Sequence, residues 1–479
     1  MSKTHPPSYL KFLLLLLALQ IFTEARGQHV AVEITVDPDA GRAGIKGRFE
    51  PGLRRESGQE FLFRSSAGGN DGLGQRISEF SALAPGGVSV KTERRAPNAF
   101  VAELIDLEGW RNVVDLRPPP DPAAAAHASW LTENGGVLML DDLVPIFGGE
   151  RKQLSAAVTL KLPGGWVSYS SEASVANGRY DIRNVEGGVV FIGPRFRSVP
   201  VKTKYGTLKL LLDGEWHFSD AEAAGMAAEI YEGYAKRLGP LPTDGAMIAL
   251  IKFPREEPPG HWEAETRGST VTIASSDTPF KSQSVQRLHE QLRHEIFHLW
   301  FPNAVNLTGD YAWFYEGAAL YESLKLGVAL KRIRFADLLD TISRAYSIDA
   351  GAQPRRPLIQ SGAVDPTVLY ARGMVVAFLS DISAMRSSRG RSGLGDALKA
   401  LFDRHKSPGG GILAKDAIEG VLDRELIRRY VDGVESIAWA AELAAAGLES
   451  RAVGRNVELS TTAKPSGRQK EILKRLGYN

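Results

Sequence analysis

The period at which apolar residues recur changes once along this chain of 479 residues, and that change limits the possible folds more than any other feature. Between about residues 28 and 200, runs such as HVAVEITV, AFVAELI and AAVTLKL alternate apolar and polar residues, and Gly, Pro, Asn and Asp separate them. Alternation at a period of two is typical of half-buried strands. The sequence therefore predicts an antiparallel β domain over residues 28–200.

A helical period begins near residue 219. Ser219 or Asp220 can cap a helix through AAGMAAEIYEGYAKRL, which GPLP ends. Two strand candidates follow, AMIALIKF and STVTIAS, and the sequence is then almost wholly helical to about Gly447. This order predicts a mixed, mainly helical α+β domain over residues 201–450, so the expected fold class is α+β with more than one domain.

The two ends of the chain are expected to lie outside these domains. Lys3 and Lys11 flank an apolar run, Phe12 to Phe22, that is too short to cross a bilayer as a helix. We expect residues 1–27 to be a secretory signal, with an uncleaved membrane anchor as the alternative. The polar, weakly patterned residues 451–479 are typical of a C-terminal tail.

Composition excludes several classes of function. The chain has no cysteine, which excludes a thiolate nucleophile and cysteine-ligated zinc. Removing residues 1–27 removes three bases and one acid, so the formal charge falls from +2 to 0. No excess of positive charge remains that would indicate binding to nucleic acid. We expect an exported protein, periplasmic or secreted, without a membrane span after signal cleavage. The oligomeric state is left open.

One helical segment carries a metal-binding pattern. Residues 285–301 read VQRLHEQLRHEIFHLWF, in which His294 and His298 share a stripe and lie about 6 Å apart along a helix axis. Two imidazoles at this spacing can bind one ion, and Glu295 beside the first is placed as a general base. The alternative is an unliganded pair of core or surface histidines, and we expect His289 to be structural.

A catalytic zinc needs a third protein ligand and an open position for water. Glu316, in GDYAWFYEGAALYESL, is the candidate, because a helix opening near Asp310 can turn this carboxylate toward the histidines. One Zn²⁺ per chain is expected. The alternative is a solvated helix carboxylate.

Three segments, HEIFHLW, WFYEGAALYE and LYARGMVVAFLSDISAMRSSRGRSGLGDALKALF, resemble the glycyl aminopeptidase family of gluzincin zinc metallopeptidases. The resemblance covers about residues 200–450. It implies a thermolysin-like catalytic domain with Glu316 as third ligand and Tyr370 as the tyrosine that stabilises the oxyanion. Relatives often continue into a peptide-binding PDZ domain, and no PDZ domain fits after Leu448.

The resemblance also suggests substrate-binding residues. In the family a glycine-rich strand carries a glutamate that holds the substrate's free amine, and Glu265 in GHWEAETRGSTVTI takes its place, with Glu263 on the same face of the strand. Arg372 stands where relatives often carry a base. The family's glycines and histidine in this strand are replaced by Trp262, Glu263 and Thr266, a departure that affects substrate preference.

These observations predict an exported zinc aminopeptidase that hydrolyses peptides or proteins by a metal-activated water, with Glu295 as general base. The altered GHWEAET strand can leave the cleft open at its amine-binding end, so a zinc endopeptidase is the first alternative. An inactive peptide-binding module of the same fold is the second.

Overall fold

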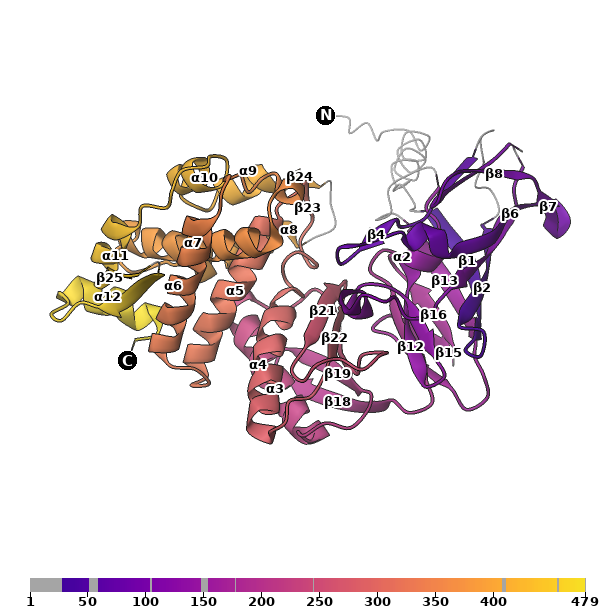
Figure 1. The fold of residues 1–479 in the computed structure, drawn as a ribbon, viewed down its shortest axis with the longest axis horizontal. Coiled ribbons are helices and arrows are strands. Elements are labelled where there is room, and N and C mark those ends of the chain that lie inside the picture. The colour runs from indigo at the N-terminus through magenta and orange to yellow at the C-terminus, as the bar shows by residue number, and fades with distance from the viewer. Residues whose placement is uncertain are drawn as a thin grey trace, which may run out of the picture.

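The computed structural model describes residues 28–50, 59–103, 106–147, 154–176, 178–243, 245–406, 411–454 and 456–478. The segment that we expect to be a signal peptide lies outside these residues. Figure 1 shows an elongated molecule with β-sheets at one end, helices at the other and a smaller sheet between them.

The first region is built from sheets. Its strands are β1 (Gln28–Asp37), β2 (Arg42–Phe49), β3 (Gln59–Leu62), β4 (Ser66–Ala67), β5 (Asn70–Asp71), β6 (Ile77–Ala84), β7 (Val88–Val90), β8 (Thr92–Ala96), β9 (Ala99–Ala102), β10 (Gly109–Asp115), β11 (Trp130–Thr132), β12 (Gly135–Met139), β13 (Leu154–Lys161), β14 (Val167–Tyr169), β15 (Ala173–Ala176), β16 (Arg179–Ile182) and β17 (Val189–Gly193). Short helices η1 (Leu73–Arg76), η2 (Pro85–Gly87), η3 (Pro122–Ala126) and α2 (Leu140–Leu143) join them.

Eight of these strands form one sheet in the order β15-β16-β13-β1-β2-β10-β6-β7, and four form a second in the order β11-β12-β17-β14. The alternating residues Val30, Val32 and Ile34 of β1 are buried, which confirms the strand period. Most neighbours are antiparallel, as predicted, but β1 and β13 run parallel.

The second region opens with a five-stranded sheet in the order β18-β19-β20-β22-β21. Its strands are β18 (Arg197–Thr203), β19 (Gly206–Leu212), β20 (Gly245–Ile251), β21 (Trp262–Arg267) and β22 (Thr270–Ser275), with helices α3 (Asp220–Leu238) and α4 (Lys281–Phe297). The change of sheet thus falls between Gly193 and Arg197, shortly before the expected boundary. The predicted helix cap is confirmed, because Ser219 and Glu222 form a capping box on α3.

The remaining chain is mainly helical. It contains α5 (Ala312–Ala329), α6 (Phe335–Gly351), η5 (Ser361–Ala363), α7 (Pro366–Ser387), α8 (Leu394–His405), α9 (Ala414–Glu419), α10 (Arg424–Tyr430), α11 (Ala440–Ala446) and α12 (Gly467–Leu476), with strands β23 (Leu307–Thr308), β24 (Ile412–Leu413), β25 (Leu448–Val453) and β26 (Asn456–Thr461). Of the helices in the described ranges, α7 alone is long and apolar enough to cross a membrane, but most of it is buried inside the protein. It is the helix around which α5, α6, α8 and α11 pack (Figure 1).

The segment that we expected to be a polar tail is folded instead. Strands β25 and β26 form an antiparallel hairpin that packs on α6, and α12 lies against α11 and α7. Helix α12 is mostly polar, yet Ile472, Leu473 and Leu476 fall on one face and are buried. Three apolar residues at helical spacing are enough to dock a short helix on an existing core.

Candidate metal centre

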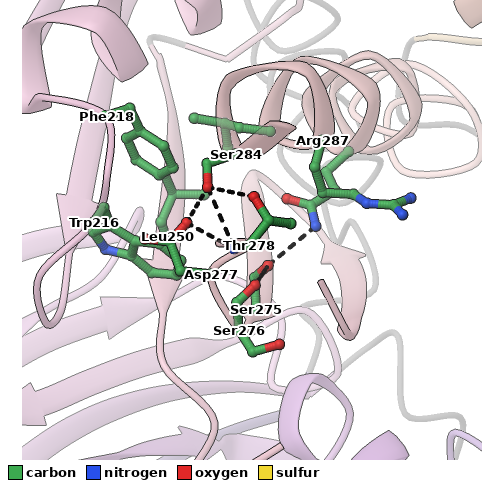
Figure 2. A pocket seen from close by; sticks show the side chains of 11 residues that line it. Trp216, Phe218, Leu250, Ser275, Ser276, Asp277, Thr278, Ser284 and Arg287 are labelled. Carbon is green, nitrogen blue, oxygen red and sulfur yellow. Dashed lines mark hydrogen bonds between the residues drawn. The ribbon is translucent and has the colours of Figure 1, made fainter. Parts of the chain in front are cut away.

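The start of α4 is fixed to the loop that follows β22. At its start, the Ser284 hydroxyl donates to the carboxylate of Asp277 and lies 2.7 Å from the Thr278 hydroxyl, beside the aromatic rings of Trp216 and Phe218 (Figure 2). The cavity among these residues measures about 10 Å³, room for about one water. We therefore regard it as part of the anchoring of α4 and not as a ligand site.

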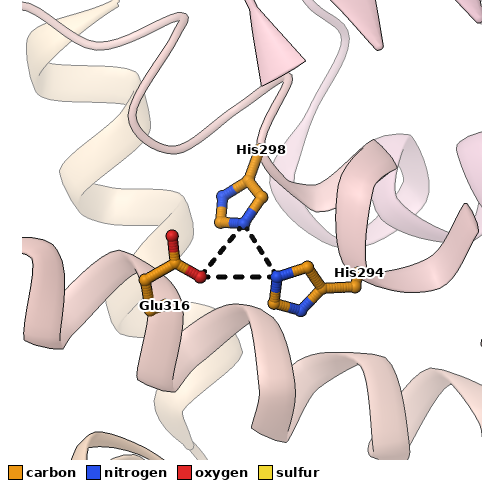
Figure 3. A group of neighbouring side chains, drawn as sticks. All are labelled: His294, His298 and Glu316. Atoms are coloured by element: carbon orange, nitrogen blue, oxygen red, sulfur yellow. Dashed lines mark hydrogen bonds and ion pairs between the residues drawn. The ribbon is translucent and has the colours of Figure 1, made fainter. Parts of the chain in front are cut away.

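The predicted ligands meet at one point between α4 and α5 (Figure 3). The Nε2 atoms of His294 and His298 lie 3.2 Å apart, and Oε2 of Glu316 lies 3.3 Å from the first and 3.5 Å from the second. Within the described part of the chain, these three residues form the one group of His, Asp or Glu side chains that lie close enough together to hold a metal ion. Two imidazoles and a carboxylate are the donor set of many catalytic zinc sites.

The surroundings of His298 suit a metal ligand. Its Nδ1 lies 2.8 Å from the carbonyl oxygen of Phe301, which can only accept a hydrogen bond. Nδ1 therefore carries a proton, and Nε2 is the nitrogen that faces the point shared with His294 and Glu316. A backbone carbonyl that fixes the tautomer in this way is a common second partner of zinc-binding histidines.

The charges of the three side chains support one another. Burial favours the neutral carboxyl of Glu316, but attraction to His298 and hydrogen bonds from both histidines outweigh it and hold the pKa of Glu316 far below its ordinary range. Burial likewise opposes a charged His298, yet the attraction of Glu316 raises the pKa of His298 to about 9. The carboxylate is thus ionised, as a metal ligand must be, whereas His298 has to release the proton on Nε2 before it can bind an ion.

Glu295 lies beside the ligands without joining them. Its side chain is buried, and its Oε1 lies 3.9 Å from Nε2 of His294, while Oε2 accepts a hydrogen bond of 2.9 Å from the hydroxyl of Thr266. This is the position that we expect for a general base, close enough to hold a water at the metal but turned away from direct ligation.

Tyr370, on α7, lies beside the ligand carboxylate of Glu316. Its hydroxyl is a hydrogen-bonding partner of Glu316, and burial together with the charge of Glu316 raises the pKa of Tyr370 well above the ordinary value. The phenol therefore keeps its proton. A neutral O–H beside the ligands can donate to an oxygen that gains negative charge, as the resemblance implies.

Glu265 reaches the cleft from β21 and is held there by two partners, whereas Glu263 on the same strand is not among the residues that line the cleft. Its Oε2 lies 3.0 Å from Nδ1 of His127, and its Oε1 lies 2.9 Å from Nε of Arg267. Burial would favour the neutral acid, but these two partners lower the pKa of Glu265 to about 2. Glu263 lies 3.9 Å from the other nitrogen of His127 and 3.3 Å from His261. Both carboxylates thus belong to a charge network that spans the two regions of the chain.

Arg372 does not reach the cleft, so its expected role in substrate binding is wrong. The residue is 1% exposed, and its guanidinium donates to the carbonyl oxygens of Tyr430 and Glu435 and pairs with Asp349 at 3.0 Å. The guanidinium holds α10 and the following loop to α7. A fork of five N–H donors suits this task better than a lysine would.

An open cleft of about 1250 Å³ contains the ligands, Glu295 and Tyr370. Its lining includes Arg64 and His127 of the first region, residues of β21, and Tyr311 and Tyr315. Sites for small molecules usually measure about 300–1000 Å³. The cleft therefore has room for several residues of a peptide.

Sequence reasoning missed four residues of this cleft. Thr266 and Asn303 touch the end of α4, His127 reaches in from the first region, and the Tyr315 ring packs against His298. Tyr315 directly precedes the third ligand and could have been suspected from that position. No local pattern identifies the other three, because the partners of Thr266 and His127, and two of the three partners of Asn303, are distant in sequence.

No protein-family model and no curated protein matches this sequence. Solved structures do match. An aminopeptidase N family protein from Idiomarina loihiensis is 14% identical with a TM-score of 0.73, over 88% of this chain and 79% of the other. The M1 zinc metallopeptidase of Deinococcus radiodurans is 16% identical with a TM-score of 0.56, over 86% of this chain and 94% of the other. A mutant of it bound to a Tyr-Ser-Ala substrate has a TM-score of 0.56 at 15% identity. The chain therefore has the fold of the M1 zinc metallopeptidases.

Proposed function

We propose that this chain is an exported zinc aminopeptidase of the gluzincin type. The observation that carries the proposal is the meeting of three ligand atoms, from His294, His298 and Glu316, within 4.8 Å of one another inside an open cleft. The site suits one Zn²⁺ per chain, with a fourth position left for water. The fold comparisons are with M1 enzymes, and the motifs around Glu316 and Tyr370 resemble those of the glycyl aminopeptidases.

The proposed reaction is the hydrolysis of a peptide bond. When bound, zinc supplies Lewis-acid chemistry that polarises the carbonyl and makes water acidic enough to attack at neutral pH. Glu295 takes the proton of the attacking water and returns it to the nitrogen of the leaving amine. Tyr370 donates its hydroxyl proton in a hydrogen bond to the carbonyl oxygen as charge develops there.

The proposal includes a thermolysin-like arrangement of the catalytic domain. It also includes peptides as the substrates. A mutant of the M1 enzyme from Deinococcus radiodurans is bound to a Tyr-Ser-Ala substrate, and mutants of a two-domain M1 zinc metallopeptidase are bound to L-tryptophan or L-arginine. An edge strand beside the ligands supports the binding of an extended chain, because β21 borders the cleft.

Export, to a periplasm or to the medium, rests on the expected signal at residues 1–27.

One observation favours a second candidate, a zinc endopeptidase. Both carboxylate oxygens of Glu265 already have a partner, Arg267 on one side and His127 on the other. A carboxylate neutralised in this way attracts a substrate ammonium less strongly than a free one. Peptides without a charged amine would then bind equally well.

A peptide-library digest with free and N-acetylated peptides, with and without a chelator, tests the proposal. We expect cleavage that removes the first residue, requires a free amine and stops when zinc is removed. Equal cleavage of acetylated peptides would establish the endopeptidase instead. Purified protein that holds no zinc and cleaves no peptide would refute both enzyme candidates and would favour the inactive peptide-binding module.

A further inference from the structure

The side chain of Thr266 joins the edge strand of the cleft to the candidate general base. Its hydroxyl lies 2.9 Å from Oε2 of Glu295 and 3.0 Å from the backbone oxygen of the same residue. That backbone oxygen already accepts a hydrogen bond of 3.1 Å from the N–H of His298. The single hydroxyl proton is therefore best used on the carboxylate, because the carbonyl oxygen already has a donor and a charged acceptor forms the stronger hydrogen bond.

This hydrogen bond fixes how the carboxylate of Glu295 is turned. With Oε2 held by Thr266, Oε1 is the oxygen that faces the ligand His294, at 3.9 Å. A glutamate has several rotamers, and each immobilised side chain of this kind loses conformational freedom. The hydroxyl supplies a partner in only one of those orientations.

Thr266 is itself held in place from the other side of the strand. The amide nitrogen of Asn303 donates to the backbone oxygens of Thr266 and His298, at 2.9 and 3.0 Å. The Asn303 oxygen accepts from the N–H of Gly268 at 2.7 Å. One amide thus ties the turn between β21 and β22 to the end of α4, beside a ligand. The position of Thr266 relative to Glu295 is therefore set by three further hydrogen bonds.

We propose that Thr266 is the positioning residue of Glu295, and that Asn303 supports it. The inference rests on the proposed function. Thr266 touches neither the ion nor the scissile bond, and it acts by keeping Oε1 of Glu295 directed at the attacking water. Because Thr266 lies on a strand that lines the cleft, the wall that receives the substrate also orients the base.

Substitution of Thr266 separates this role from a general effect on folding. T266V keeps the shape and removes the hydroxyl, while T266S keeps the hydroxyl and removes a methyl group. Groups that orient a catalytic side chain from outside typically contribute about 10- to 100-fold to activity. We expect kcat of T266V to fall by about that factor, with KM and zinc content unchanged, and T266S to retain most of the activity. T272V, a buried threonine on β22, is the matched control and should behave as wild type.

Two kinetic outcomes would overturn the proposal. One is a zinc-loaded T266V with the kcat of the wild type, and the other is a T266S that is as slow as T266V. If T266V does not fold, T266A takes its place in the comparison with T266S. A crystal structure of the zinc-loaded variant decides the matter independently of turnover, because Glu295 should leave its wild-type rotamer. An inactive wild type would refute the proposed function alone, and an unchanged Glu295 rotamer would refute the role of Thr266 alone.

Discussion

The backbones of Gly317 on α5 and Gly373 on α7 touch. A Cβ atom placed on Gly317 would lie 2.3 Å from the carbonyl carbon of Gly373, closer than real Cβ contacts come. Gly317 follows the ligand Glu316, and Gly373 lies one turn beyond Tyr370. The close approach of these two helices therefore brings the tyrosine to the ligand carboxylate.

Replacing Gly317 with alanine should push the helices apart. Inserting a methyl group into a packed core typically costs about 1–3 kcal/mol. We expect G317A to lower the free energy of unfolding by that amount and to bind zinc more weakly, because Glu316 moves with the helix. Urea unfolding and a zinc titration measure the two effects. G225A, on α3 with open space around it, is the control and should be neutral or stabilising.

Glu295→Gln should abolish turnover while the protein keeps its metal. The amide is similar in size and can still bond to Thr266, but it cannot take a proton from water. General acid and base groups typically contribute about 10²- to 10⁴-fold. We expect kcat to decrease by a factor within this range. Zinc occupancy, measured by mass spectrometry, should remain complete. Normal turnover by E295Q would show that the assigned mechanism is wrong.

Tyr370→Phe should slow the reaction without weakening substrate binding. The phenol keeps its proton because burial raises its pKa, so it can donate over the whole working range of pH. Loss of one donor to an oxyanion typically costs about 10²- to 10³-fold in kcat. Steady-state kinetics of Y370F should show that loss with KM within about threefold of wild type. An increase in KM at unchanged kcat would instead indicate ground-state binding.

Arg372→Met tests the correction to its role. The guanidinium is buried among Asp349, Tyr430 and Glu435, and removing one partner of a buried ion pair typically costs about 3–5 kcal/mol. We expect R372M to unfold at lower urea concentration, while the folded fraction keeps the KM of the wild type. A raised KM in a fully stable variant would restore the substrate-binding role.

Local patterns were sufficient for the metal centre. Helix α4, the spacing of His294 and His298, and the helix that carries Glu316 all follow from patterns within short segments, and the structure brings the three side chains together. The cap of α3 at Ser219 follows from the same kind of pattern. Such features depend on neighbours in sequence, so the sequence alone identifies them.

Interactions between distant residues were not predictable in this way. Glu265 lies within hydrogen-bonding distance of His127, which belongs to the other region of the chain, and nothing near either residue in sequence indicates the pairing. Arg372 sits beside a motif but bonds to carbonyl oxygens near residue 430. Helix α12 is too polar to be recognised until its apolar face meets α11. In each case the partner is supplied by tertiary packing.

His289 should make the fold sensitive to acid. It is buried on α4, and neither ring nitrogen has a hydrogen-bond partner among the residues that the structure describes. Burial, with the nearby positive charges of Arg293 and Arg332, lowers the pKa of His289 to about 3, from 6.5 for a free side chain. Between these two values the unfolded chain binds the proton and the folded chain does not. Stability contributed by the neutral ring is therefore complete above pH 6.5 and is lost as the pH falls toward 3.

His289→Leu should remove this dependence without breaking a hydrogen bond. Linkage predicts that wild type loses about 2 kcal/mol more than H289L between pH 7.5 and pH 5, because the unfolded histidine is almost fully protonated at the lower pH. Urea unfolding of both proteins at the two pH values measures the difference. Acid release of zinc affects both proteins equally, so it cancels in the comparison. Parallel losses in wild type and H289L would mean that His289 accepts a proton inside the folded protein, and that its burial does not keep it neutral.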